Sequence, residues 1–151
     1  MQTFQWTSQF DTGIETVDQQ HRELVKLINH LGTVSVEGDN FDSAISPILG
    51  ELTDYAMNHF SEEEDLMEEC RLDRRHIEHH QLQHSRFIEE IEEIWGLRGT
   101  QQDPVGVLGE FLSSWLASHI LEEDQSMARQ MDRIRSGMSP DAAYRGDQRS
   151  K

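Results

Sequence analysis

Apolar residues recur along this chain at alternating intervals of three and four positions, in four separate stretches. This spacing puts side chains on one face of an α-helix and predicts amphipathic helices that bury that face. The first predicted helix runs from Thr16 to Val36, and Gly38, Asp39 and Asn40 break its pattern. Its buried positions are Val17, His21, Leu24, Ile28 and Leu31.

The second and third helices include polar residues among their buried positions. Those of the second are Ile45, Leu49, Leu52, Ala56, His59, Glu63, Leu66 and Cys70. Its start is open, because Pro47 is tolerated in the first turns of a helix and also fits the first helical position after Ser46 as N-cap. The buried positions of the third helix are Ile77, His80, His84, Phe87, Ile91 and Ile94. This helix ends between Gly96 and Gly99.

The fourth helix is predicted to begin with Asp103 as its N-cap and Pro104 at its first helical position, and to run to about Ser136. Its buried positions are Val105, Leu108, Leu112, Trp115, His119, Ile120, Asp124, Met127, Met131 and Ile134. Residues five apart lie about 140° from each other around an α-helix. We therefore expect His119 and Asp124 to approach a shared site from different directions. The chain as a whole is predicted to be all-α.

These helices form one predicted domain, residues 1–136, in which residues 1–15 are an N-terminal arm. Residues 137–151 are short and polar, and we predict that they form a flexible tail. A chain of 151 residues buries roughly two-thirds of its unfolded surface, so its core needs no disulfide. Cys70 is the single cysteine and is expected to be a small core residue.

The charge balance limits the classes of partner. Thirteen Lys and Arg residues stand against 29 Asp and Glu residues, which gives a formal net charge of −16. Such a surface repels phosphate groups, so neither nucleic acid nor an acidic membrane surface is an expected partner. No apolar run approaches the roughly 20 residues of a membrane span, and the first residues lack the basic and apolar regions of a signal peptide. We therefore expect a cytoplasmic protein.

Seven residues of metal-binding types lie at the buried positions of the four helices. They are His21, His59, Glu63, His80, His84, His119 and Asp124. The pairs on the second and third helices are each four residues apart, so their members point into the same space. Burying an unpaired carboxylate costs several kcal/mol, and the two acidic residues therefore favour a bound cation. Two octahedral iron ions offer about 12 positions. Five imidazoles, two bridging carboxylates and a single-oxygen bridge leave one of them open for a small molecule.

Other interpretations apply to single members of this set. A lone histidine on a buried face, such as His21 by itself, is more often a hydrogen-bonded core residue than a ligand. Only the joint occurrence of all seven favours a metal centre. His30, His76 and His79 lie beside the buried faces, where surface or supporting roles are expected. A structural zinc ion is tetrahedral and leaves three of the seven ligands unused.

The segments that contain these residues are similar to one known family. They read FQWTSQFDTGIETVDQQH, HFSEEEDLM, HHQLQHSRF and HILEED, and they span almost the whole chain. In combination they resemble the hemerythrins, and specifically the single-domain bacteriohemerythrins. The resemblance implies an antiparallel up-down-up-down four-helix bundle around two non-haem iron ions with a bridging oxo or hydroxo group. By motif position it implies His80, His84 and His119 on one iron, His21 and His59 on the other, and Glu63 and Asp124 between them.

The third helix leaves one alternative open. Between Glu63 and the histidine pair of this helix, the family typically has fewer residues and a Tyr-Pro turn that this chain lacks. His76 and His80 are also four residues apart and form a second possible pair. Phe87 lies three residues after His84, as in the family pattern, and favours His80 with His84.

The resemblance implies reversible binding of O2 for storage, delivery or sensing, at the iron with two histidines. Five neutral imidazoles also suit an oxygen binder better than the carboxylate-rich sites of ferritin-like bundles. Phe60, Trp115 and Ile120 are expected to line the oxygen pocket. The alternative function is a di-iron enzyme with peroxidase or nitric-oxide-related activity. The sequence identifies no protein partner and is compatible with a monomer.

Overall fold

The computed structural model of the chain describes residues 4–34 and 41–149. Within these ranges all regular secondary structure is helical, as predicted. The α-helices are α1 (Glu15–Thr33), α2 (Phe41–Glu69), α3 (Arg74–Gly96), α4 (Pro104–His119), α5 (Gln125–Arg135) and α6 (Pro140–Arg149). The predicted end of the first helix at Val36 and the break at residues 38–40 lie outside the described residues.

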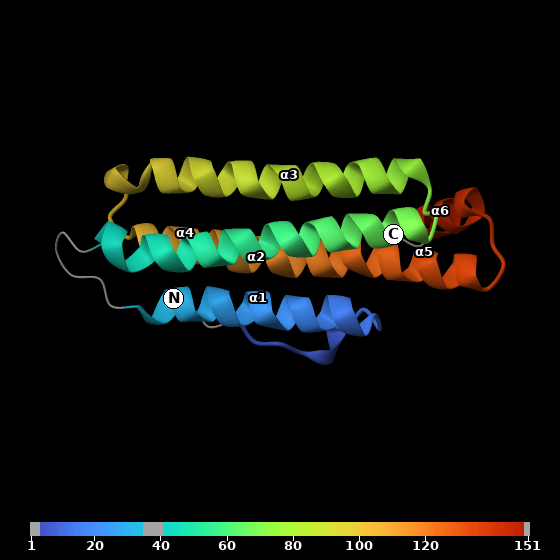
Figure 1. Cartoon of the computed structure of the whole chain (residues 1–151), viewed down its shortest axis with the longest axis horizontal. Coiled ribbons are helices and arrows are strands. Elements are labelled where there is room, and N and C mark those ends of the chain that lie inside the picture. Colours follow the sequence, from blue (N-terminus) through green and yellow to red (C-terminus); the bar gives the residue numbers. More distant parts are fainter. Residues whose placement is uncertain (1–3, 35–40, 150–151) are drawn as a thin grey trace.

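The long helices pack side by side around a shared interior. α1 lies against α2 and α4, and α3 lies against the same two helices. Figure 1 shows that α1, α2, α3 and α4 run along the long axis of the molecule in alternating directions, and that α5 continues the line of α4. Every long helix therefore turns one face toward the interior, which explains the spacing of apolar residues in the sequence.

The interior contains two apolar clusters with a polar layer between them. Leu24 and Leu52 belong to the larger cluster, and Val17 and Met127 belong to the smaller one. On α1, His21 is fully buried and lies in sequence between Val17 of one cluster and Leu24 of the other. Glu63 and Asp124 likewise lie in sequence between residues of the larger cluster, Phe60 and Ile120, and residues of the smaller one, Met67 and Met127. The apolar residues on both sides thus seal the polar layer from water.

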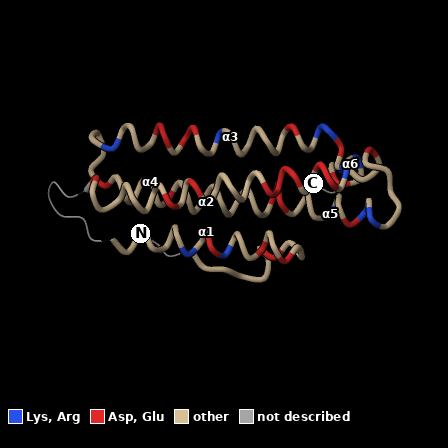
Figure 2. The backbone as a smooth tube through the Cα atoms, in the orientation of Figure 1, with Lys and Arg blue, Asp and Glu red and all other residues tan. Residues whose placement is uncertain are grey.

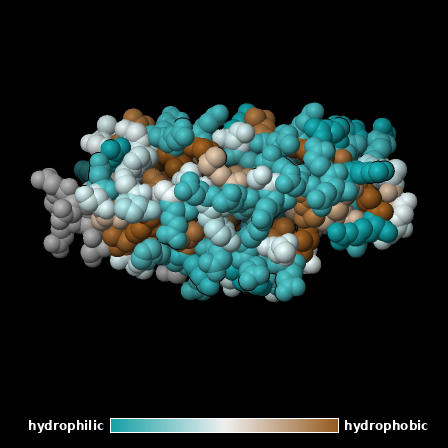
Figure 3. Space-filling view, in the orientation of Figure 1, coloured by the Kyte–Doolittle hydropathy of each residue, from teal (hydrophilic) through white to brown (hydrophobic). Residues whose placement is uncertain are grey.

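Polar side chains cover most of the outer surface. Figure 2 shows acidic residues on α1, α2 and α3, and Figure 3 shows a mainly hydrophilic face with separated hydrophobic areas. Within the described ranges, no helix combines the length and the apolar character needed to cross a membrane.

The residues before α1 fold back against the helices. Phe10 ends a short 3-10 turn and is buried in the larger apolar cluster. The backbone N–H of Phe4 donates to Asn29 Oδ1 at 2.8 Å, and Asn29 Nδ2 donates to the Phe4 carbonyl at 3.0 Å. Asp18 of α1 accepts backbone hydrogen bonds from the residues just before the helix. These contacts fix where α1 begins.

Two helix starts were considered in the sequence. Asp103 caps α4 as predicted, because its side chain accepts a hydrogen bond from the N–H of Gly106 at 3.1 Å, and Pro104 is the first helical residue. α2 begins earlier than a Ser46 cap would allow, and Pro47 lies inside the helix. Pro47 is the seventh residue of α2, beyond its first turn, and so removes one internal hydrogen bond, the one to the carbonyl of Ser43.

The predicted fourth helix is not a continuous α-helix. A π-helical segment, Ile120–Asp124, separates α4 from α5. Such segments occur mostly as single turns inside α-helices and are frequent at functional sites. Periodicity of apolar residues cannot reveal this segment, because it shifts the pattern by only one residue.

The flexible tail predicted for residues 137–151 is wrong for most of its length. Residues Pro140–Arg149 form α6, which packs against α5. Ser139 Oγ accepts a hydrogen bond from the N–H of Ala142 at 3.1 Å and so caps the start of this helix. Ala143 and Asp147, four residues apart, are both fully buried. The prediction failed because a single small apolar residue and a paired aspartate hold the helix in place, and neither raises the hydrophobicity of the segment.

Candidate metal centre

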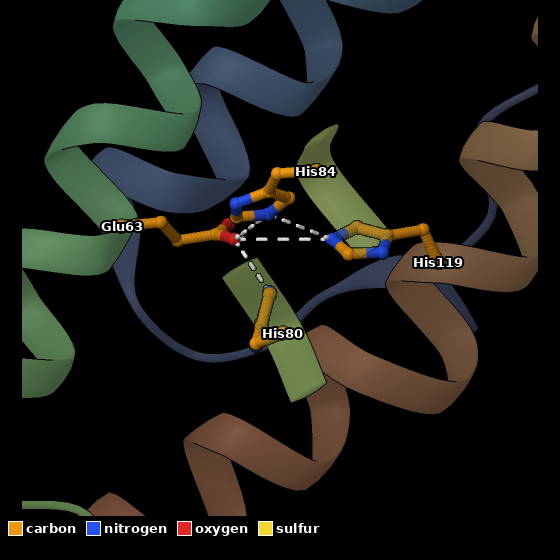
Figure 4. Close-up of side chains that lie close together, drawn as sticks. All are labelled: Glu63, His80, His84 and His119. Atoms are coloured by element: carbon orange, nitrogen blue, oxygen red, sulfur yellow. Dashed lines mark hydrogen bonds and ion pairs between the residues drawn. The ribbon is translucent and has the colours of Figure 1, made fainter. Parts of the chain in front are cut away.

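The seven residues predicted as metal ligands converge in the polar layer between the two apolar clusters. α1 supplies His21, α2 supplies His59 and Glu63, α3 supplies His80 and His84, α4 supplies His119, and the π-helical segment supplies Asp124. Each of the seven is at most 4% exposed. Figure 4 shows Glu63, His80, His84 and His119 pointing toward one another from three helices.

One group of donor atoms surrounds Oε1 of Glu63. His80 Nε2 lies 2.9 Å from this oxygen, and His84 Nε2 lies 3.2 Å from it. His119 Nε2 is 3.9 Å from the same oxygen and 3.2 Å from His84 Nε2. These four residues each offer a ligand atom within 4.8 Å of the others, a spacing that suits one metal ion.

A second group of donor atoms surrounds the other oxygen of Glu63. His59 Nε2 lies 3.0 Å from Glu63 Oε2, and His21 Nε2 lies 3.6 Å from it. His21 Nε2 is also 2.9 Å from Oδ2 of Asp124. His21, His59, Glu63 and Asp124 form the second set of ligand atoms within 4.8 Å of one another.

The two carboxylates connect these groups. Oε1 of Glu63 faces the histidines of α3 and α4, while its Oε2 faces those of α1 and α2. Asp124 Oδ1 lies 3.0 Å from His80 and 3.3 Å from His119, while its Oδ2 faces His21. Each carboxylate therefore presents one oxygen to each group, as a ligand shared by two ions must.

The π-helical segment explains how His119 and Asp124 reach the same space. In a π-turn the hydrogen bond joins residues five apart rather than four, so residues five apart come round to the same side of the helix. The expectation that these two side chains approach from directions about 140° apart holds only for a regular α-helix and is wrong here. Their ligand atoms are 3.3 Å apart.

The hydrogen bonding of the candidate ligand atoms shows whether a cation fits the centre. Several buried atoms make no hydrogen bond within the described residues, although they lie close to one another: His21 Nδ1 and Nε2, His59 Nε2, Glu63 Oε2, His119 Nδ1 and both Asp124 carboxylate oxygens. Each such buried polar atom costs about 1–3 kcal/mol. Imidazole and carboxylate ligands suit first-row transition metals, including iron. Two cations would satisfy most of these atoms at once, so the residues present fit a two-metal centre.

The closeness of carboxylates and imidazoles shifts the pKa values of several candidate ligands. Burial by itself lowers the pKa of His80, but the carboxylates of Asp124 and Glu63 outweigh burial and raise the pKa to about 10. The pKa of His21 rises to about 9 by the same balance. Burial raises the pKa of Glu63, but the surrounding histidines, His59 foremost, hold it well below its usual range. These pKa shifts favour ionised carboxylates beside protonated His21 and His80.

This charge state predicts proton release on metal uptake. A metal ion needs the lone pair of Nε2, whereas His21 and His80 hold an extra proton below their pKa values of about 9 and 10. Anaerobic loading with ferrous iron at about pH 7.5 should therefore release protons. The release should fall toward zero as the pH rises above about 10, where both rings are already neutral. A pH indicator in weakly buffered solution measures it, and loading without any release would contradict the charge state.

Three of the candidate ligand histidines have a polar partner on the opposite ring nitrogen. His59 Nδ1 lies 2.6 Å from Gln20 Oε1, and His84 Nδ1 lies 2.9 Å from Glu64 Oε2. His80 Nδ1 lies 3.0 Å from Nε2 of His76. Partners of this kind fix the tautomer and ring orientation of metal-binding histidines. Sequence reasoning missed Gln20 and Glu64, which adjoin His21 and Glu63 in sequence but have no spacing of their own to mark them.

The structure also distinguishes between the two histidine pairs considered for the third helix, His80 with His84 and His76 with His80. His80 and His84 both direct Nε2 at Glu63 Oε1. His76 is buried, but its Nε2 meets His80 and its Nδ1 meets Gln130, so it lies behind His80 rather than among the ligands. His79 has a side chain 53% exposed. The geometry thus favours His80 with His84.

Aromatic rings cover the side of the centre formed by His84 and His119. Phe60 stacks on the His84 ring with centroids 3.9 Å apart, and Trp115 stacks on the His119 ring at 4.4 Å. The rings of Phe60 and Trp115 are themselves 5.8 Å apart. Ile120, the third predicted pocket residue, is fully buried in the larger apolar cluster beside them. This wall is apolar.

The fold and the centre together define a helical metal-binding domain, and comparisons with known proteins agree. The family model for the hemerythrin HHE cation binding domain matches residues 12–131. The chain is 35% identical over 137 residues to a bacteriohemerythrin of Pseudomonas aeruginosa, covering 89% of this chain and 83% of the relative. It is 32% identical over 126 residues to a bacteriohemerythrin of Stenotrophomonas maltophilia, covering 83% and 80%. It is 32% identical over 127 residues to one of Clostridium acetobutylicum, covering 81% and 96%.

These matches extend over most of the chain and include all seven ligand positions within the matched range. The chain belongs to the hemerythrin family. The family resemblance predicted from four short motifs is therefore confirmed.

Proposed function

We propose that this protein binds O2 reversibly at a di-iron centre inside an antiparallel up-down-up-down four-helix bundle. The observation that carries the proposal is the way Glu63 and Asp124 each present one oxygen to both groups of histidines. Two iron ions, joined in addition by an oxo or hydroxo group, would supply the reversible binding of O2. The cytoplasm is the proposed location, since Cys70, the one cysteine of the chain, has no disulfide partner.

The histidines divide unequally between the two proposed ions. His80, His84 and His119 would hold one of them, and His21 and His59 the other. The ion with two histidines has one protein ligand fewer and is the one with an open position for O2. Neutral imidazoles outnumber carboxylates in this set, which favours the reduced ions and distinguishes the centre from carboxylate-rich oxidation sites.

The aromatic wall protects such a centre. Phe60 and Trp115 lie flat against the rings of His84 and His119, and Ile120 is fully buried in the same apolar cluster. Excluding water and protons from bound O2 is what distinguishes a reversible carrier from an oxidase or a peroxidase. The apolar contacts of these residues therefore support binding over turnover.

An absorption spectrum tests the proposal. Iron-loaded protein should be nearly colourless when reduced, gain a visible band on exposure to air, and lose the band again when oxygen is removed under argon. Several such cycles should give the same spectra. A band that never forms, or one that forms once and does not reverse, would contradict reversible binding. Continuous consumption of hydrogen peroxide or nitric oxide would favour the enzymatic alternative.

Trp115→Ala should shorten the life of the oxygenated protein. Removing the ring opens the wall above His119 to water and protons, so the oxygenated form should still appear but decay several-fold faster to the oxidised form. Its half-life under air, followed in the visible spectrum, is the quantity to measure.

Trp95→Ala is the matched control, because Trp95 is also a partly buried tryptophan in the larger cluster but stacks on Arg98 rather than on a ligand. An unchanged half-life in fully loaded, folded Trp115→Ala protein would assign Trp115 to core packing alone.

A further inference from the structure

A row of buried polar side chains leads from the metal centre to the C-terminal helix. His80 Nδ1 lies 3.0 Å from His76 Nε2, and His76 Nδ1 lies 3.1 Å from Gln130 Nε2. Gln130 Nε2 donates to Ser126 Oγ at 3.1 Å, and Ser126 Oγ donates in turn to Asp147 of α6. The row therefore passes from α3 through α5 to α6 without a break.

The residues of this row are among the most buried polar groups of the chain. Ser126, Gln130 and Asp147 are fully buried, and His76 is 3% exposed. Burying polar groups is unfavourable unless all are hydrogen-bonded, and apolar residues of similar size would fill the same space at lower cost. Ser126 and Gln130 are four apart on α5 and so share one face. Gln130 contacts both His76 and Ser126, and Ser126 contacts Asp147.

Asp147 anchors the far end. Arg129 Nε donates to Asp147 Oδ1 at 2.6 Å, and Arg133 Nη1 lies 3.7 Å from the same oxygen. A second attachment joins α6 to α3, where the Arg75 guanidinium pairs with Asp141 at 2.7 Å. α6 lies beyond residue 131, where the match to the family domain ends. Asp147, the last residue of the row, thus belongs to a segment outside the residues that the family model matches.

The orientation of His80 depends on what holds its Nδ1. For His59 and His84 the partner is a single side chain, Gln20 or Glu64, whereas for His80 it is His76 and the row behind it. A ligand whose opposite nitrogen is held in place cannot turn its ring away from the metal.

We propose that His76, Gln130, Ser126 and Asp147 are positioning residues that hold His80 toward the metal, and that α6 is in this way part of the centre. The inference rests on the proposed metal centre and adds a role for residues that touch no metal. It predicts that breaking the row weakens the hold on metal without removing a ligand.

The first test compares two replacements of His76 in the full-length, iron-loaded protein. His76→Leu keeps the volume but removes the contact to His80, while His76→Gln retains a polar group that can reach it. Iron content and the rate of iron transfer to a chelator are measured, with unfolding in denaturant as the check on folding. His76→Leu should keep both irons but lose them at least about tenfold faster, and His76→Gln should restore most of the wild-type rate.

The second test asks whether α6 matters through the row. Ser126→Ala cuts the connection between Gln130 and Asp147 and leaves the Arg129–Asp147 pair in place. Ser136→Ala, at the exposed end of α5, is its matched control, because its hydroxyl bonds only to the local Asp132 carbonyl. Iron release should be faster in Ser126→Ala and unchanged in Ser136→Ala.

The outcomes separate this inference from the proposed function. Wild-type protein that takes up no iron would overturn the metal centre itself, and the inference with it. Wild-type protein that holds two irons, with release rates in His76→Leu and Ser126→Ala equal to wild type, would overturn the inference alone. Equal acceleration in His76→Leu and His76→Gln, in step with their loss of stability, would also overturn it, because only a general packing role would remain.

Discussion

Glu63→Ala is expected to abolish binding of both metal ions, not just one. Its two oxygens face different groups of histidines, so a single substitution removes a ligand from each proposed ion. Asp124→Ala should act in the same way, because its oxygens are divided similarly. Iron content should fall from about two per chain to near zero, measured by elemental analysis after gel filtration.

The same substitutions should also remove the stability that metal confers. A ligand that binds only the folded state stabilises it by about 2.7 kcal/mol at one hundred times its dissociation constant. Wild-type protein should therefore unfold at higher denaturant with iron than without, and Glu63→Ala should show no such difference. Glu69→Ala, on the exposed side of the same helix, is the control and should behave as wild type. Full iron content in Glu63→Ala would show that the carboxylate is not shared.

His84→Ala should have a larger effect than substitution of either His76 or His79 on the same helix. The His84 Nε2 atom lies 3.2 Å from both Glu63 Oε1 and His119 Nε2, so its loss takes a terminal ligand from the group that holds the first ion. Stable binding of two irons and the oxygen-dependent band should both disappear. Iron content and the aerated spectrum are the measurements.

His79→Ala is the matched control, since His79 lies on the same helix but its side chain is 53% exposed and pairs with Glu123. It should load and respond to oxygen like wild type. His76→Ala should still load two irons, because His76 supports His80 and does not face the centre. Loss of iron in His76→Ala together with normal loading of His84→Ala would show that His76 and His80 are the true ligand pair.

Much of this architecture could be read from spacing in the sequence. The alternation of three and four positions placed the buried faces of the long helices, because a helix that packs against others on one side must bury a stripe. The seven candidate ligands could be found because they occupy that stripe, where burying an unpaired carboxylate such as Glu63 is costly and favours a cation. Asp103 and Pro104 marked the start of α4 because the N–H groups there need a cap.

The features that spacing missed depend on contacts between distant segments. The π-helical turn that ends at Asp124 shifts the pattern of buried positions by only one residue, which is too small a change to identify it from spacing. α6 is held by Ala143 and by the pairing of Asp147 with Arg129, which no local property of a polar segment reveals. His76 was recognised only as a residue beside the buried face, since its partner Gln130 is more than fifty residues away.

A crystal structure of the iron-loaded protein, with an anomalous difference map at the iron edge, tests the central claim most directly. The account predicts two peaks per chain, one among His80, His84 and His119 and one beside His21 and His59, with Glu63 and Asp124 contacting both. A single peak, or a peak held by His76, His80 and Glu123, which also bring ligand atoms within 4.8 Å of one another, would contradict it.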